Sequence, residues 1–109
     1  MYIPDKGDII YLDFDPSAGK EIIKRRPAFV ISRKAFNGHT GFAVVAPITV
    51  TIRNMKLEVV LPDETSVHGA VLVHQIKSLD FKNGQAEFKE KAPEATTDKV
   101  TELAKIIIL

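Results

Sequence analysis

Residues 42–48 read Phe-Ala-Val-Val-Ala-Pro-Ile, a continuous apolar run that ends at Thr49. Short runs rich in β-branched residues are typical of strands, and a run without polar interruptions indicates a strand that is covered on both faces. Residues 27–32, Pro-Ala-Phe-Val-Ile-Ser, show the same pattern. The middle of the chain therefore predicts two buried strands.

Strand patterns continue on both sides of this centre. Three further strands are predicted, at residues 8–14, 57–61 and 70–76. The dipeptide Asn83-Gly84 favours a two-residue hairpin turn, which would join residues 79–81 to residues 86–88. Most of the chain is thus expected to be β-structure.

Helical patterns are limited to two places. Residues 33–37 can form a short helical turn, and Pro93 suits the first turn of a longer C-terminal helix. One apolar stripe at helical spacing runs through Val100, Leu103, Ala104 and Ile107. Several short strands followed by one helix predict a mainly β fold, a small curled barrel capped by a helix, and residues 1–109 form a single domain.

Composition excludes several classes of protein. Hydrophobic residues make up 45% and charged residues 27% of the 109 residues, which is a globular balance rather than a disordered one. The absence of cysteine excludes disulfides, thiolate metal sites and a thiol nucleophile. The longest apolar run, residues 106–109, is far shorter than a membrane span, and the first residues lack a signal-peptide pattern. We therefore expect a cytoplasmic protein without a membrane partner.

Charge is unevenly distributed along the chain. The net charge is −3 for residues 1–15, +7 for residues 16–57 and −3 for residues 58–109, although the total is only +1. A basic middle third is a candidate surface for a polyanion such as nucleic acid. The alternative is a solvated surface on which the charges mix after folding, and charge alone leaves both open.

Two places in this basic third could carry chemistry. The loop 19–27 holds one carboxylate, Glu21, among Lys20, Lys24, Arg25 and Arg26, a composition that suits a phosphate-handling site. Thr49 could present its hydroxyl at the rim of the barrel. The alternatives are a simply solvated loop and a threonine satisfied by a neighbouring carbonyl.

Metal chemistry has no support in the sequence pattern. His39, His68 and His74 each lack a second histidine or a carboxylate at metal-ligand spacing, so no metal site and no cofactor are predicted. For His74, a packed or surface position is the expected one. A pair of histidines that folding brings together stays open.

The order of the short motifs resembles one known family. The motifs are Gly7-Asp8-Ile9-Ile10, Phe14-Asp15-Pro16, Gly19-x-Glu21, Arg26-Pro27-Ala28, Ala46-Pro47-Ile48-Thr49 and Gln75-Ile76-Lys77-Ser78-Leu79-Asp80. In this order they resemble the MazF/PemK (Kid) toxins and span nearly the whole chain.

This resemblance implies an SH3-like barrel of the CcdB/MazF toxin type that works as a homodimer. It implies the toxin of a type II toxin–antitoxin system, an endoribonuclease that cuts messenger RNA at short single-stranded sequences without a metal ion. It also implies a MazE/PemI-like antitoxin whose flexible tail occupies the RNA groove, with contact to DNA only through that antitoxin.

The resemblance also assigns roles to individual residues. The arginine before Pro-Ala, here Arg26, and the threonine that ends the PIT motif, here Thr49, are catalytic in the family, and the acid after Gly-x, here Glu21, assists in some members. The RNA-contacting positions correspond to Phe14, Gln75 and Lys77. Further cations are expected to follow the RNA phosphates: Lys20, Lys24, Arg25 and Arg53.

A mechanism follows from these roles. The 2′-hydroxyl of the RNA would attack the phosphorus and leave 2′,3′-cyclic phosphate and 5′-hydroxyl ends. Arg26 would stabilise the charge on the phosphoryl oxygens, Thr49 would fix the scissile group, and Glu21 would act as general base.

The chain departs from the family pattern in its loop. Many members have Gln and Gly at the positions of Ile22 and Lys24, and Asp or Asn at the position of His74. The loss of a glycine restricts the backbone of the loop and affects the expected base preference. The alternatives are therefore a catalytically impaired toxin, a gyrase-targeting toxin of the same fold that acts by binding only, and a non-toxic interaction module.

Overall fold

Seven strands, two α-helices and one 3₁₀ turn make up the part of the chain that the computed structural model describes, residues 1–14 and 25–109. In chain order they are β1 (Asp8–Asp13), β2 (Arg25–Val30), α1 (Lys34–Thr40), β3 (Phe42–Thr49), β4 (Glu58–Val60), β5 (Ala70–Leu72), the 3₁₀ turn η2 (Val73–Gln75), β6 (Lys77–Asp80), β7 (Glu87–Lys91) and α2 (Glu94–Ile108). The expected mainly β fold with a C-terminal helix is confirmed.

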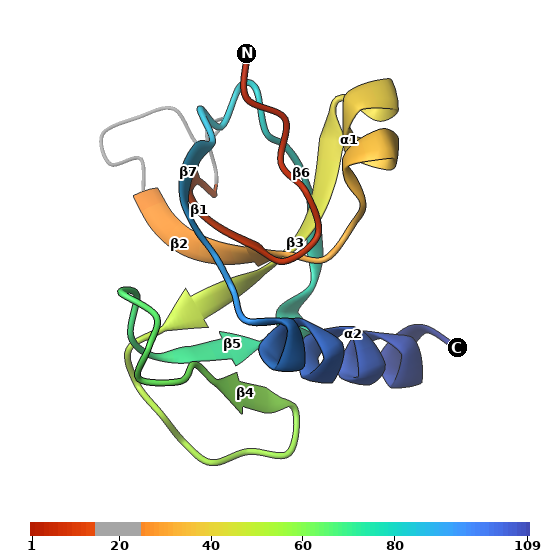
Figure 1. The fold of residues 1–109 in the computed structure, drawn as a ribbon. Helices are drawn as coiled ribbons and strands as arrows, with labels where there is room; N and C mark the ends of the chain where they lie inside the picture. Colours follow the sequence, from red (N-terminus) through yellow and green to blue (C-terminus); the bar gives the residue numbers. More distant parts are fainter. Residues whose placement is uncertain (15–24) are drawn as a thin grey trace.

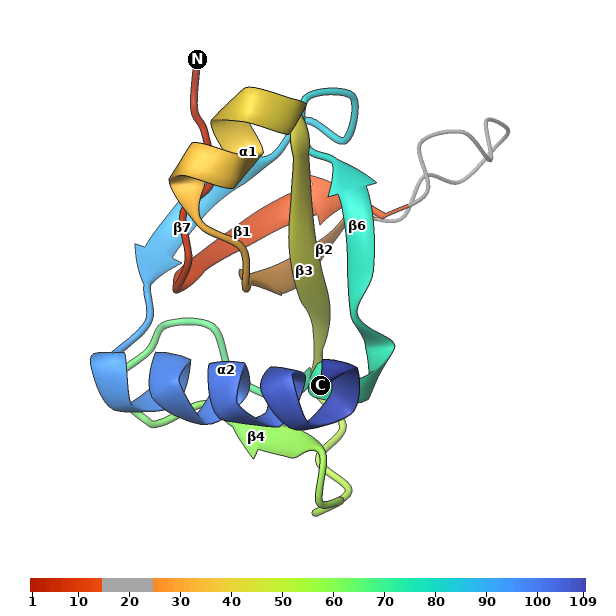
Figure 2. The ribbon, with the colours of Figure 1, turned by 90° about the vertical axis from the view of Figure 1, so that its right-hand side faces the viewer.

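The longest strand, β3, organises the sheet. The strand order is β4-β5-β3-β2-β1-β7, with β6 added beside β3, and each of these pairs is antiparallel. The first half of β3 pairs with β6 and its last two residues pair with β5. Figures 1 and 2 show β4, β5 and α2 gathered at the end of the molecule opposite the N-terminus. The result is a barrel-like, strongly curved sheet rather than a closed barrel.

The expected hairpin around Asn83-Gly84 is only half right. A tight turn is present, because the amide of Gly84 donates to the carbonyl of Asp80 at 2.9 Å and that of Ala86 to Phe81 at 2.9 Å. Nevertheless, β6 pairs with β3 and β7 pairs with β1, so the two strands that flank the turn lie on different neighbours. The turn therefore brings together the two ends of the curved sheet.

The strand expected at residues 70–76 is interrupted. Val71 of β5 faces Ile48 of β3, and an unbroken register would place His74 opposite Val45. Instead, Val45 faces Lys77. The η2 turn takes up the three extra residues. Because these residues leave the ladder, Gln75 does not pair with β3 and is exposed.

Two apolar clusters explain the continuous apolar runs in the sequence. Alternate residues of a strand point to opposite faces, so Phe29 and Ala46 join one cluster while Ala28 and Val45 join the other. The first cluster lies against α2 through Val100 and Ala104, and the second fills the curved sheet. The prediction that β2 and β3 are covered on both faces is confirmed.

Helix α2 extends beyond the core that it covers. Val100 and Ala104 are buried and Leu103 packs at the edge of the core, as the apolar stripe predicts, but Ile107 is 42% exposed. The last turn thus projects past the sheet, which is visible at the C-terminus in Figure 1. Among the residues that the structure describes, no helix is long and apolar enough to cross a membrane.

A polar cluster ties the N-terminus to the sheet. The carboxylate of Asp8, only 3% exposed, accepts hydrogen bonds from the hydroxyl of Tyr2 and the amide of Asp5, and pairs with the ammonium of Lys91 at 2.8 Å. Burial and the hydrogen bond to Asp8 raise the pKa of Tyr2 far above its usual value, so the hydroxyl stays a donor. We refer to Tyr2, Asp5, Asp8 and Lys91 as the N-terminal cluster. The Gly7-Asp8 motif is therefore a structural feature.

Candidate active site

The pairing of β2 with β3 decides how two of the expected site residues meet. The ladder pairs Ala28 with Pro47 and Phe29 with Ala46. Continued by two residues toward the strand ends, this register places Arg26 directly opposite Thr49. Directly opposed residues of an antiparallel pair share a face, with Cβ atoms about 5 Å apart. The arginine and the threonine, 23 positions apart in the sequence numbering, are thus neighbours.

A cleft of about 400 Å³ opens at this point. Its described lining comes from β2, β3, the loop after β3, β5 and η2, and consists of Arg26, Pro27, Pro47, Ile48, Thr49, Val50, Arg53, Leu72 and Gln75. Four residues expected from the sequence, Arg26, Thr49, Arg53 and Gln75, are brought together here. This lining contains two cations and no carboxylate, so the cleft favours an anionic ligand.

The hydroxyl of Thr49 is oriented by its own chain. Its Oγ1 accepts a hydrogen bond from the backbone amide of Thr51 at 3.2 Å. A hydroxyl that accepts in this way keeps its own proton for donation. The side chain is only partly exposed, at the end of β3. Thr49 can therefore donate to a phosphoryl oxygen in the cleft.

The backbone of Thr49 is supported from behind by Gly69. Gly69 has a φ of +131°, and a Cβ atom at this position would overlap the carbonyl oxygen of Thr49. Only glycine fits such a backbone conformation and such a close approach. No local sequence pattern marks Gly69 as a residue of the site.

Arg53 reaches the cleft from the loop between β3 and β4. The carboxylate of Glu58 accepts hydrogen bonds from the backbone amides of Arg53 and Met55, each at 3.1 Å. The amide of Arg53, followed by the other loop amides, holds the pKa of Glu58 below its usual value. Sequence patterns missed this arrangement, because a carboxylate that binds backbone amides leaves no side-chain motif.

Arg25 does not line the cleft. Adjacent residues of a strand point to opposite faces, and Arg25 faces Asp13 on β1. Its guanidinium pairs with Asp13 at 3.3 Å and Glu87 at 3.1 Å, and donates to the carbonyl of Gln85 at 2.8 Å. Although the sequence suggested a contact with RNA, the described structure uses Arg25 to connect β1, β2 and β7.

Phe14 and Lys77 form a separate pair. Phe14 belongs to the second apolar cluster and is only 9% exposed, while the ammonium of Lys77 lies 5.9 Å from the centre of its ring. The described conformation thus leaves little of the ring accessible for a stacked base. Contacts of either residue with RNA stay predictions.

The remaining expected site residues lie in residues 15–24, outside the described part of the chain. They are Glu21, Lys20 and Lys24, and Ile22 lies there too. The three histidines are exposed. Within residues 1–14 and 25–109, no three side chains of His, Cys, Asp or Glu are grouped so that they could hold a metal ion.

Comparisons with known proteins match nearly the whole chain. A family described as PemK-like, MazF-like toxin of type II toxin–antitoxin systems matches residues 5–108. The endoribonuclease toxin MazF of Escherichia coli K12 is 37% identical over 94 residues, which cover 85% of this chain and 84% of that protein. Crystal structures of MazF and of a MazE–MazF complex from Deinococcus radiodurans match with TM-scores of 0.88 and 0.89, each at 36% identity. These matches cover 99% and 98% of this chain, and 98% and 97% of theirs.

Proposed function

The chain belongs to the family of PemK-like, MazF-like toxins of type II toxin–antitoxin systems, and from this premise we propose that it cuts single-stranded RNA at short specific sequences without a metal ion. The protein is an endoribonuclease toxin. The observation that carries the proposed chemistry is that Arg26 and Thr49 line the same cationic cleft.

The proposed reaction uses a nucleophile within the substrate. The 2′-oxygen attacks the adjacent phosphorus, the bond from phosphorus to the 5′-oxygen breaks, and the products are a 2′,3′-cyclic phosphate and a 5′-hydroxyl end. Negative charge builds up on the phosphoryl oxygens in the transition state. The guanidinium of Arg26 offers a permanently charged, planar set of donors for these oxygens, and Thr49 fixes the group through a hydrogen bond.

Two proton transfers complete the reaction. The 2′-hydroxyl must lose a proton, and the leaving 5′-oxygen must gain one. We assign the first transfer to Glu21, the carboxylate closest in sequence to Arg26, although it lies outside the described residues. A guanidinium keeps its positive charge in proteins, so Arg26 stabilises the phosphoryl oxygens and is not assigned as the base. The leaving 5′-oxygen takes its proton from a water molecule.

Substrate binding is assigned to the rest of the cleft. Arg53 supplies a second cation for a neighbouring phosphate, and Gln75 can donate and accept hydrogen bonds with a base edge. Lys77, which follows Gln75 by two residues, and the neighbouring Phe14 are further candidate contacts. A messenger RNA substrate would place the site of action in the cytoplasm.

Control of this activity is proposed to come from a cognate antitoxin. The similar protein of Deinococcus radiodurans has been crystallised as a MazE–MazF complex. By this analogy, two copies of the chain form a dimer, and a MazE/PemI-like partner binds them through a flexible tail that covers the RNA cleft. The cationic lining suits an acidic tail.

The test is cleavage of a long unstructured RNA in EDTA, with mapping of the new 5′ ends. We expect discrete cuts with 5′-hydroxyl ends from the wild type. Arg26→Ala should lower the cleavage rate by about 100-fold or more, because a charge-stabilising donor is lost, and Thr49→Ala should lower it strongly as well. Both variants should unfold at nearly the wild-type temperature, since these side chains lie at strand ends.

Arg25→Ala is the matched comparison, because it removes the same kind of side chain one residue away. It should lower the unfolding temperature slightly and the cleavage rate far less than Arg26→Ala. If Arg25→Ala and Arg26→Ala reduce cleavage equally, the assignment of Arg26 to the reaction is wrong. A wild type that cuts none of several RNAs would favour the catalytically impaired toxin that Ile22 and Lys24 suggest. Inhibition of gyrase would then be measured to test the toxin that acts by binding only.

A further inference from the structure

The loop between β3 and β4, residues 50–57, forms one wall of the cleft. It contributes Val50 and Arg53 to the lining, and Val50 is 84% exposed. Asn54 in this loop has a φ of +57°, a left-handed conformation that is uncommon outside glycine. An exposed loop of this kind needs an anchor if it is to hold a cation at a fixed place.

Glu58 provides the anchor. Both of its carboxylate oxygens accept the amide of Arg53, and one also accepts the amide of Met55. The amide of Glu58 in turn donates to the carbonyl of Met55 at 3.2 Å. Residues 53–58 therefore form a closed turn around one negative charge, and the amide groups compensate that charge.

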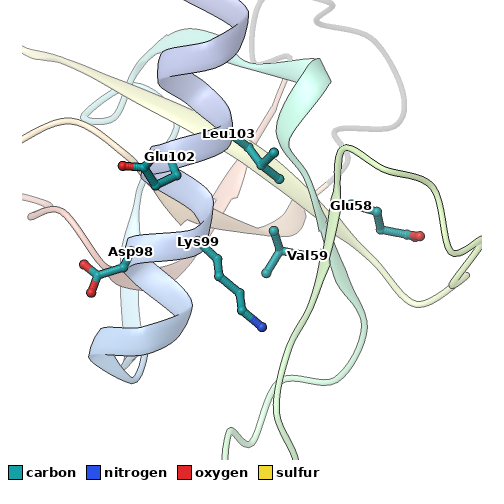
Figure 3. A pocket seen from close by; sticks show the side chains of 6 residues that line it. All are labelled: Glu58, Val59, Asp98, Lys99, Glu102 and Leu103. Carbon is teal, nitrogen blue, oxygen red and sulfur yellow. The ribbon is translucent and has the colours of Figure 1, made fainter.

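The sheet connects the anchor Glu58 to Thr49. Glu58 faces Leu72 across β4 and β5, and β5 in turn pairs with the end of β3 at Thr49. Figure 3 shows the Glu58 side chain pointing away from the α2 residues Asp98 and Lys99 and toward the loop. The position of the loop relative to Thr49 is thus set by the sheet.

We propose that Glu58 is a positioning residue that fixes Arg53 at the cleft for binding of the RNA phosphates, an inference that rests on the proposed function. Glu58 does not touch the substrate. Without its carboxylate, the loop amides lose their common acceptor and Arg53 samples many positions, so RNA binding must order the loop. The cost falls on binding rather than on the chemical step, which depends on Arg26 and Thr49.

The test compares steady-state cleavage of a short single-stranded RNA by wild type, Glu58→Ala and Glu58→Gln. Ordering one loop side chain on binding should raise KM about 3- to 10-fold in Glu58→Ala, with kcat within about twofold of wild type. Glu58→Gln keeps one acceptor oxygen, so its KM should lie between those of wild type and Glu58→Ala. Arg53→Ala should show the same KM effect, and adding Glu58→Ala to it should change KM little further.

Glu90→Ala is the matched control. Glu90 also accepts backbone amides of a loop, those of Ser66 and Val67 at 2.9–3.0 Å, but this loop does not line the cleft. Its removal should cost stability without raising KM. A similar rise of KM in Glu90→Ala would show a general loss of rigidity and overturn the proposal.

A second readout does not depend on activity. Amide hydrogen exchange at Arg53 and Met55 should be faster in Glu58→Ala than in wild type and unchanged in Glu90→Ala. If exchange in Glu58→Ala is unchanged, or if it is faster while KM is unchanged, the role proposed for Glu58 is wrong. The proposed function would not be affected by either result. If wild type neither binds nor cuts RNA, no KM exists for any variant and the proposed function fails first, which distinguishes the two failures.

Discussion

The N-terminal cluster and the cleft both contain charged side chains, but these are paired within the chain in the cluster and exposed in the cleft. In the N-terminal cluster, Asp8 is buried and each of its contacts is with another residue of the chain. In the cleft, Arg26 and Arg53 are exposed, and neither guanidinium has a carboxylate partner among the described residues. Charge that is satisfied internally holds the fold, whereas charge that faces a cleft is available to a ligand.

The difference predicts that substitutions in the two regions have separable effects. Substitutions in the N-terminal cluster should lower the free energy of unfolding and leave the folded enzyme competent. Substitutions in the cleft should lower catalysis and leave the free energy of unfolding nearly unchanged. Three further experiments test this separation.

The largest effect on stability is expected from Asp8→Ala. It leaves the Tyr2 hydroxyl and the Asp5 amide without their acceptor and removes the shortest ion pair of Lys91, whose ammonium still donates to the carbonyl of Lys6. The substitution should reduce the free energy of unfolding by about 3 kcal/mol. Urea unfolding measures this value. Tyr2→Phe removes one donor only and should cost about 1 kcal/mol. Cleavage per folded molecule should stay at the wild-type level, and a specific loss of kcat would contradict the separation.

Gly69→Ala should affect both the stability of the fold and catalysis. The new Cβ atom would overlap the carbonyl of Thr49 at a φ that suits glycine only. We expect a loss of about 2 kcal/mol in the free energy of unfolding, with a lower kcat because Thr49 is displaced. Thermal unfolding and single-turnover cleavage test the two parts. If kcat per folded molecule is unchanged, the support that Gly69 gives to Thr49 has no catalytic value.

The smallest effect is expected from Glu90→Gln, and it depends on pH. Partial burial raises the pKa of Glu90, but hydrogen bonds from Ser66 and Val67 outweigh it and hold the pKa below its usual value. A lowered pKa in the folded state stabilises the protein above the usual glutamate range, and this contribution is lost as the pH falls through the lowered pKa. The variant should be about 1 kcal/mol less stable than wild type at pH 7, after discounting for solvent. The difference should shrink below about pH 4. A constant difference from pH 7 to pH 3 would exclude the ionic contribution.

Local patterns in the sequence predicted most of the strands and helices but fewer of the pairings between strands. The strands at residues 8–14 and 42–48 follow from runs of apolar and β-branched residues, and helix α2 follows from the helical spacing of its apolar residues. Both signals are properties of short segments. The partners of β6 and β7 depend on the closure of the whole sheet, so the Asn83-Gly84 turn was identified and the strand pairing was not. The interruption at Val73–Gln75 also depends on pairing with β3 and leaves no local signal.

The candidate site was predictable for a different reason. Composition marked the loop 19–27 and Thr49 only as possibilities, and the resemblance to a known family is what assigned roles to Arg26 and Thr49. The structure adds that both residues line one cleft, where β2 begins and β3 ends. A contact of Arg25 with RNA was expected from its charge and stays a prediction, while its ion pairs with Asp13 and Glu87 are a feature that charge alone did not reveal.

The opposition of Arg26 and Thr49 also determines where evolution can change the length of this chain. The excursion through α1 joins β2 to β3 outside their ladder, so residues gained or lost near Gly38 and Gly41 would leave the register intact. A single deletion between Ala46 and Thr49 would instead send the threonine hydroxyl to the opposite face of the sheet. Insertions and deletions among homologues should therefore be common in the connection that contains α1 and rare in the last residues of β3.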